Sequence, residues 1–146
     1  MNLSFTILEC SDKQEFVDSV CIAGLLDYNL KQTNNKLQIP APEIIKVARN
    51  QEGTIIGGIS GSMFLSGIEI ETLWVDERYR GHRIASTLLS TIEDEARKAG
   101  CQVAYLTTYS FQGPDFYPKC GYVFCGKVDG FIDDISLYTF KKELIA

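Results

Sequence analysis

The stretch LWVDERYRGHRIASTLL, from Leu73 to Leu89, decides the fold of this chain. Alternating apolar and polar residues predict a strand over residues 69–76, a turn follows over residues 77–82, and a helix is predicted over residues 83–99. A helix that begins where a sheet strand ends presents free backbone N–H groups and the positive end of its dipole, and both attract anions. The order of elements therefore predicts an anion site at this turn.

The side chains of the turn strengthen that interpretation. Arg80, His82 and Arg83 add hydrogen-bond donors, and two of these side chains are permanently charged. Gly81 allows a ligand to come close to the backbone. The pattern suits a pyrophosphate, but a helix start with solvated basic side chains explains it equally well at this point.

The helix after the turn has a clear apolar face, and its members recur at helical spacing: Ile84, Leu88, Leu89, Ile92 and Ala96. A basic residue and a glycine end it at Lys98-Ala99-Gly100. Upstream, strands are predicted at residues 44–49, 54–65 and 68–76, joined by short links that favour antiparallel hairpins. Glycines inside the second run indicate a bulge or a close approach to the backbone: Gly57, Gly58 and Gly61.

The remaining elements are predicted from shorter patterns. Residues 3–9 alternate like a first strand, and Ser11 is the expected N-cap of a helix that runs to about Tyr28. The polar residues 31–36 predict a loop, alone or with a short second helix, and this loop is a candidate cover for a substrate. Downstream, a brief helix is predicted at residues 114–120, and three further strands are predicted at residues 103–107, 122–126 and 136–142. We expect one α+β (mixed α/β) domain over residues 1–146.

Bulk composition narrows the classes of function. With 146 residues, 45% of them hydrophobic, the chain has the size of one domain with a buried core. No apolar run reaches the roughly 18 residues of a membrane span. The start lacks the basic and apolar parts of a signal peptide, so we expect a cytoplasmic protein with no membrane partner.

Charge and metal-ligating residues exclude other classes. A net charge of −5 repels phosphate backbones, so nucleic acid is a poor partner, whereas a cationic amine is attracted. Five cysteines cannot all pair within the chain, and their spacing matches no zinc pattern. They are expected to be small buried or half-buried thiols. With a single histidine besides, no metal site is expected.

The stretch from Leu73 to Leu89 resembles motif A of the GNAT superfamily of N-acetyltransferases, (Gln/Arg)-x-x-Gly-x-(Gly/Ala). Arg80 and Ala85 fall on its first and last positions. The segment SFQGPDFYPKCGY, from Ser110 to Tyr122, resembles the second family signature, Phe-Tyr-x-Lys-x-Gly-(Phe/Tyr). The two occur in the family order, and the resemblance covers roughly residues 54–144. It implies a GNAT-like, mostly antiparallel central sheet of about six or seven strands, flanked by three or four helices.

The resemblance also implies an activity and its co-substrate. The protein would transfer the acetyl group of acetyl-CoA to a primary amine of a small molecule or peptide, by direct attack in a ternary complex. The strand residues before the turn would pair with the pantetheine arm, and the turn would hold the pyrophosphate. The residues assigned to the cofactor in this way are Leu73, Trp74, Val75, Arg80, Gly81, His82, Arg83, Ile84, Ala85, Ser86 and Ser110.

Three residues are candidates for catalysis. The resemblance gives Tyr117 the role of general acid that protonates the leaving thiolate. Glu71 and Glu69 are candidate bases, because strand alternation would place them on the face of Leu73 and Val75. Solvated strand acids explain the two carboxylates equally well, and many relatives use no dedicated base.

One departure from the motif concerns Arg83, which replaces its internal glycine. Because helical φ is negative, the backbone is expected to tolerate arginine there. Arg83 would then swing outward and add charge to a CoA phosphate; the competing hypothesis is weakened cofactor affinity. The departure also admits a different class of protein, an acyl-CoA-binding sensor or regulatory module with little turnover. The acceptor stays open, and a homodimer joined through the C-terminal strands is compatible with the pattern.

Overall fold

The chain divides into two compact units in its computed structural model, which describes residues 3–145. One unit comprises residues 1–37 and the other residues 38–146. Each is described by itself, and the single domain over residues 1–146 stays a prediction.

The first unit is a helical segment that follows an irregular start. It consists of α1 (Lys13–Phe16), a π-helical stretch (Val17–Leu26) and α2 (Asp27–Gln32), in direct succession. Asp12 rather than Ser11 is the N-cap, because its Oδ1 accepts the backbone N–H groups of Gln14 and Glu15 at 3.0 and 3.3 Å. The predicted N-cap is therefore wrong by one residue, and the helical segment continues past Tyr28.

The strand predicted over residues 3–9 is wrong as well. The described residues there have no regular secondary structure. Alternation supplies a face for a strand, but a strand also needs a neighbour for its N–H and C=O groups. The sequence pattern cannot show whether that neighbour exists.

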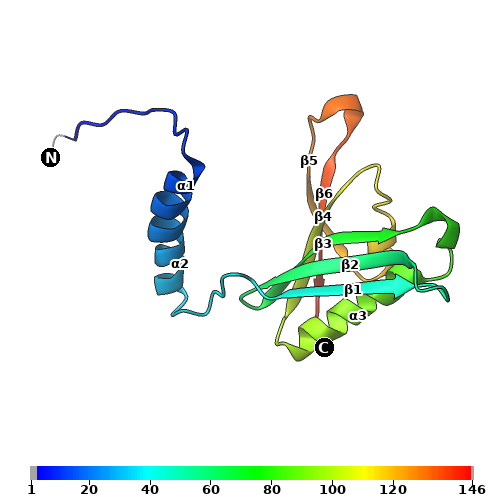
Figure 1. Cartoon of the computed structure of the whole chain (residues 1–146). Helices are drawn as coiled ribbons and strands as arrows, with labels where there is room; N and C mark the ends of the chain where they lie inside the picture. The colour runs from blue at the N-terminus through cyan, green and yellow to red at the C-terminus, as the bar shows by residue number, and fades with distance from the viewer. Residues whose placement is uncertain (1–2, 146) are drawn as a thin grey trace. The chain divides into compact units, whose positions relative to one another are not determined.

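The second unit is built on a sheet of six strands in the order β1-β2-β3-β4-β6-β5 (Figure 1). The strands are β1 (Glu43–Arg49), β2 (Ile55–Phe64), β3 (Gly67–Val75), β4 (Val103–Tyr109), β5 (Val123–Val128) and β6 (Leu137–Glu143). All pairs are antiparallel except β3 with β4, which is parallel. The helices of this unit are α3 (Ile84–Lys98) and the short α4 (Phe116–Lys119), with 3₁₀ turns at Glu77–Tyr79 and Ile132–Asp134. The α+β class and the mostly antiparallel sheet are confirmed.

Helix α3 supplies the core of this unit. It lies along β1, β2 and β3, and its predicted apolar face is buried: Leu88, Leu89, Ile92 and Ala96. Leu89 and Ile92 are among the most deeply buried side chains, and burial of each contributes about 1.5–3 kcal/mol. Gly100 ends the helix with φ +93°, and Cys101 N–H returns to Ala96 O at 2.8 Å. This buried face therefore holds α3 against β1, β2 and β3.

A bulge between β2 and β3 changes which side chains face the core. The register shifts between Ser60 and Gly61, so that Glu71 is an extra residue on β3. A side chain at Gly61 would place its Cβ 2.9 Å from Glu69 O, which explains the glycine and confirms the predicted irregularity. The bulge reverses the alternation of β3.

One prediction fails because of this bulge. Ile68 and Ile70 face the core before it, and Leu73 and Val75 face the core after it. Glu69 and Glu71 are therefore on the opposite face from Leu73 and Val75. The predicted shared face is wrong, because a bulge breaks the strand period of two.

Strands β3 and β4 separate toward their carboxyl ends. They pair only where Gly67, Ile68 and Glu69 meet Val103, Ala104 and Tyr105. Beyond these residues the two strands no longer form a ladder with each other. Two cavities of this unit adjoin the opening between them.

Candidate functional site

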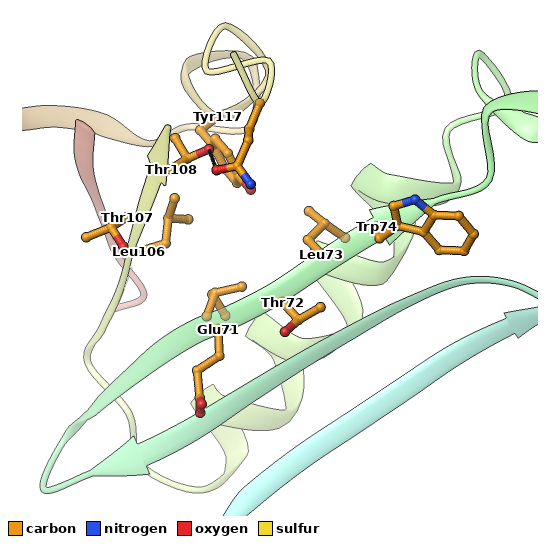
Figure 2. Close-up of a pocket in the computed structure, with 10 residues that line it drawn as sticks. Glu71, Thr72, Leu73, Trp74, Leu106, Thr107, Thr108 and Tyr117 are labelled. Atoms are coloured by element: carbon orange, nitrogen blue, oxygen red, sulfur yellow. Dashed lines mark hydrogen bonds between the residues drawn. The ribbon is translucent and has the colours of Figure 1, made fainter. Parts of the chain in front are cut away.

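Two cavities adjoin the opening between β3 and β4. The first, which we call the strand cavity, has a volume of about 360 Å³ (Figure 2). It is lined by residues 70–74 of β3, Leu106, Thr107 and Thr108 of β4, Gln112 and Tyr117. The second, the helix-side cavity, has a volume of about 580 Å³ and also reaches Val75, Arg80, Ala85 and Phe116.

The two cavities share part of their lining, which we call the shared wall. It consists of Leu73, Trp74, Gln112 and Tyr117. A chemical group lying at this wall is accessible from both cavities. The arrangement therefore suits a reaction between two molecules that enter from different sides.

A smaller pocket of about 220 Å³ lies at the start of α3. Its lining includes Arg80, Gly81 and Arg83, together with Ile84, Ala85 and Ser86 of the first turn. The side chain of the N-cap residue Arg83 makes no capping hydrogen bond, so it leaves the N–H groups of the first turn of α3 free for a ligand. Gly81 has φ +83°, a conformation that favours glycine. This set of backbone donors with two guanidinium groups fits a phosphate group chemically.

Arg83 differs from its predicted conformation. It has φ 63° and ψ 21°, in the left-handed region, so the expectation of a negative φ is wrong. The reason is its place as N-cap, just outside the helix, where the chain turns from the extended Arg80 into α3. Its carbonyl accepts the N–H of Thr87 at 3.0 Å and the hydroxyls of Ser86 and Thr87 at 3.1 and 2.7 Å. These bonds hold a conformation that costs a non-glycine residue about 1–2 kcal/mol.

The other basic side chains of the turn also bond to its backbone. Arg80 Nε donates to Val75 O at 3.1 Å and so ties the turn to the end of β3. His82 Nδ1 lies 3.1 Å from both Tyr79 O and Arg80 O, and its side chain is exposed. Arg80 lines two of the pockets, whereas His82 lines none of these three.

Tyr117 is a half-buried member of the shared wall. Its ring packs at 5.1–5.9 Å between centroids against Phe116, Phe140 and Tyr122. Its carbonyl accepts the N–H groups of Cys120 and Tyr122 at 2.9 and 3.0 Å, which closes the turn after α4. Burial, with a smaller contribution from charge on Cys120, raises the pKa of Tyr117 above its ordinary value of 10.0. Its phenol therefore holds its proton at neutral pH.

The two candidate carboxylates lie in different surroundings. Glu71 lines the strand cavity and accepts a hydrogen bond from the Ser62 hydroxyl. Figure 2 shows its carboxylate pointing away from Leu73 and Tyr117. Glu69 lies opposite Tyr105 of β4 and is not among the residues lining the strand cavity. Burial, followed by the charges of Glu69 and Glu71, raises the pKa of Tyr105.

Ser110 was a predicted cofactor residue, but in the structure Gln112 and not Ser110 lines the two cavities. Ser110 N–H donates to Ser136 O at 2.8 Å, and Ser110 Oγ accepts Ser136 N–H at 3.1 Å. These bonds join the chain after β4 to the start of β6. Gln112, two residues later, lines both cavities and was not predicted. Its only signal in the sequence was its place between a strand and Tyr117.

Other expectations concern what the site lacks. Among residues 3–145, no three His, Cys, Asp or Glu side chains gather to hold a metal ion, and the absence of a metal stays a prediction. No helix in this range is long and apolar enough to cross a membrane.

All five cysteines are free thiols; Cys10 and Cys125 are exposed, contrary to the expected burial.

Comparisons with known proteins agree with this geometry. Residues 15–122 match the model of the acetyltransferase (GNAT) family. Over 98 residues, 66% of this chain and 72% of the relative, the chain is 31% identical to blasticidin-S acetyltransferase of Streptomyces morookaense. It is 34% identical over 95 residues to an acetyltransferase of Agrobacterium fabrum, covering 65% and 69% of the two chains. The crystal structure of an acetyltransferase from Bacillus cereus superposes with a TM-score of 0.84 at 33% identity, over 94% of this chain and 97% of that one.

Proposed function

Because this chain belongs to the GNAT family of acetyltransferases, we propose that it transfers the acetyl group of acetyl-CoA to a primary amine of a small molecule or peptide. The observation that carries the proposal is the shared wall between two cavities. One cavity suits the cofactor arm and the other the amine, so both meet at Tyr117. That arrangement supports direct attack in a ternary complex.

The cofactor would occupy the helix side of the site. The pocket at the start of α3 suits its pyrophosphate, with Arg80, Arg83 and the first-turn N–H groups as donors. The helix-side cavity beside Leu73, Trp74 and Val75 suits the pantetheine arm. Acetyl-CoA, when bound, supplies an activated acetyl thioester. His82 and Ser110 have no part in this proposal, because their side chains bond elsewhere.

The proton transfers are assigned to two residues. Tyr117, with its raised pKa, holds a proton at Oη for the leaving sulfur. Glu71 lines the strand cavity, where the amine would enter, and would take a proton from it through water. The orientation of its carboxylate in Figure 2 favours such an indirect role over direct contact. Glu69 lies outside this cavity lining and has no assigned role.

The acceptor is proposed to be a cationic amine. A net charge of −5 attracts cations to the molecule in general, and Glu71 adds a carboxylate to the lining of the cavity proposed for the amine. Blasticidin-S is the first compound to test, because a relative at 31% identity is named for it. Small amines and peptides complete the panel.

The test is an acceptor screen monitored by release of free CoA thiol, with acetyl-CoA binding measured in parallel by calorimetry. Transfer to at least one amine, with N-acetyl product identified by mass spectrometry, is the expected result. Tight binding of acetyl-CoA without transfer to any amine would support the binding module instead. Absence of both binding and transfer would contradict the proposed cofactor.

A further inference from the structure

Gln112 has a side chain whose orientation is fixed by its neighbours. Its Oε1 accepts the backbone N–H of Tyr109 at 2.7 Å and the hydroxyl of Thr108 at 3.4 Å. Because a backbone N–H can only donate, the oxygen and not the nitrogen of the carboxamide must face β4. Thr108 is buried, so this side of the contact is well held.

The same contacts determine where the nitrogen lies. With Oε1 turned to β4, the Nε2 group and its two N–H donors are directed away from the strand. Gln112 is exposed in this structure and lines both the strand cavity and the helix-side cavity. Its two N–H donors are therefore left free of β4, on a residue that lines both cavities.

The shared wall offers few donors for a reacting group. Leu73 is apolar, and Figure 2 shows the indole of Trp74 pointing away from Tyr117. Tyr117 Oη is already assigned to the leaving sulfur. Of the wall side chains, Gln112 is left to serve the carbonyl oxygen, on which negative charge grows as the amine attacks.

We propose that Gln112 Nε2 donates a hydrogen bond to the carbonyl oxygen of the acetyl thioester and stabilises its developing negative charge. This role rests on the proposed function. In the reaction the N–C bond forms and the C–S bond breaks. The amine proton leaves through water toward Glu71, and the Tyr117 proton goes to sulfur. Gln112 gains and loses no atom.

The test uses two variants, Gln112→Glu and Gln112→Leu. Glutamate keeps an oxygen for Tyr109 N–H but has no donor, and leucine removes both functions. The readout is the infrared carbonyl stretch of acetyl-CoA labelled with ¹³C at the carbonyl, bound to the protein. We expect the wild-type band to lie below that of free acetyl-CoA, and the shift to be lost in both variants. CoA without its acetyl group should bind to wild type and variants within about threefold, and kcat should fall by about 10²–10³-fold.

The control is Asp115→Asn, an equally small change in the same segment. Asp115 is exposed and its side chain makes no capping bond to α4, so the band should stay shifted. An unshifted wild-type band, or a shift that survives in both Gln112 variants, would overturn the proposal. So would equal losses of CoA and acetyl-CoA affinity, because they indicate a structural role. A shifted wild-type band with transfer to no amine would contradict the proposed function; it would support the hydrogen bond from Gln112 to the bound thioester but not its role in transfer.

Discussion

At the scale of single residues, Arg83 combines a strained backbone with a charge at the pocket proposed for the CoA pyrophosphate. Its left-handed φ of 63° costs about 1–2 kcal/mol that glycine would not pay. We expect Arg83→Gly to raise the free energy of unfolding by at most about 1 kcal/mol. The gain from relieving the strain is partly offset, because glycine also increases the conformational entropy of the unfolded chain. Urea denaturation measures this change.

The matched variant Arg83→Ala separates the backbone from the charge. Alanine removes the guanidinium and keeps the strained conformation, so the free energy of unfolding of this variant should stay near that of wild type. If Arg83 contacts a CoA phosphate, both variants should lose acetyl-CoA affinity in calorimetry. A large gain in affinity for Arg83→Gly would instead show that arginine obstructs the cofactor.

A second residue-scale prediction concerns Tyr117 as general acid. Removing its hydroxyl in Tyr117→Phe should lower kcat by about 10²–10⁴-fold with little change in acetyl-CoA affinity. Burial disfavours the phenolate and raises the pKa above 10.0, so the proton is held below that pH and lost only as pH rises through the raised value. The pH profile of kcat should therefore show no falling limb from this group below pH 10. Tyr138→Phe, outside the cavity linings, is the control.

At the scale of elements, an ion pair between a buried carboxylate and a half-buried lysine joins α3 to β6. Glu93, only 3% exposed, accepts bonds from Tyr122 Oη and Lys142 Nζ, both at 2.8 Å. Lys142 Nζ also donates to Cys120 O at 2.9 Å. Glu93→Gln would leave the ammonium group without its counter-charge, at a cost of about 3–5 kcal/mol in unfolding free energy.

The same helix provides the comparison for this prediction. Glu95 pairs with Lys46 at 2.6 Å, but their side chains are 47% and 38% exposed. Solvent screens such a pair, so Glu95→Gln should cost less than about 1 kcal/mol in the same urea titration. Equal costs for the two variants would show that the Glu93 pair is not held as the structure indicates.

The elements also show how far sequence reasoning reaches. The apolar face of α3 and the hairpins of β1 to β3 could be predicted, because local periodicity determines them. The geometry of individual residues could not be predicted from the sequence. One bulge at Glu71 reversed the faces of β3, and the left-handed Arg83 depends on how a turn meets a helix. Gln112 was missed because its role depends on a cavity formed by strands far apart in sequence.

At the scale of the whole second unit, the site follows from the way its sheet opens. The parallel pairing of β3 with β4 stops after Glu69 and Tyr105, and the bulge at Glu71 turns Leu73 and Val75 to the α3 side. Cavities then lie at the opening and at the start of α3. The chemistry proposed for Tyr117 and Gln112 thus depends on the sheet and not on one motif alone.

This architecture predicts how the two substrates are used. Both cavities reach the shared wall, and its members Leu73, Trp74, Gln112 and Tyr117 include neither cysteine nor serine to take up the acetyl group. Initial-rate plots against both substrates should therefore intersect, as in a ternary complex. Intact-mass spectrometry after incubation with acetyl-CoA alone should show no added acetyl group. Parallel lines together with an acetylated protein would show a covalent step in the reaction. In that case Cys120, which is half-buried and lies three residues after Tyr117, would be the first thiol to replace by alanine.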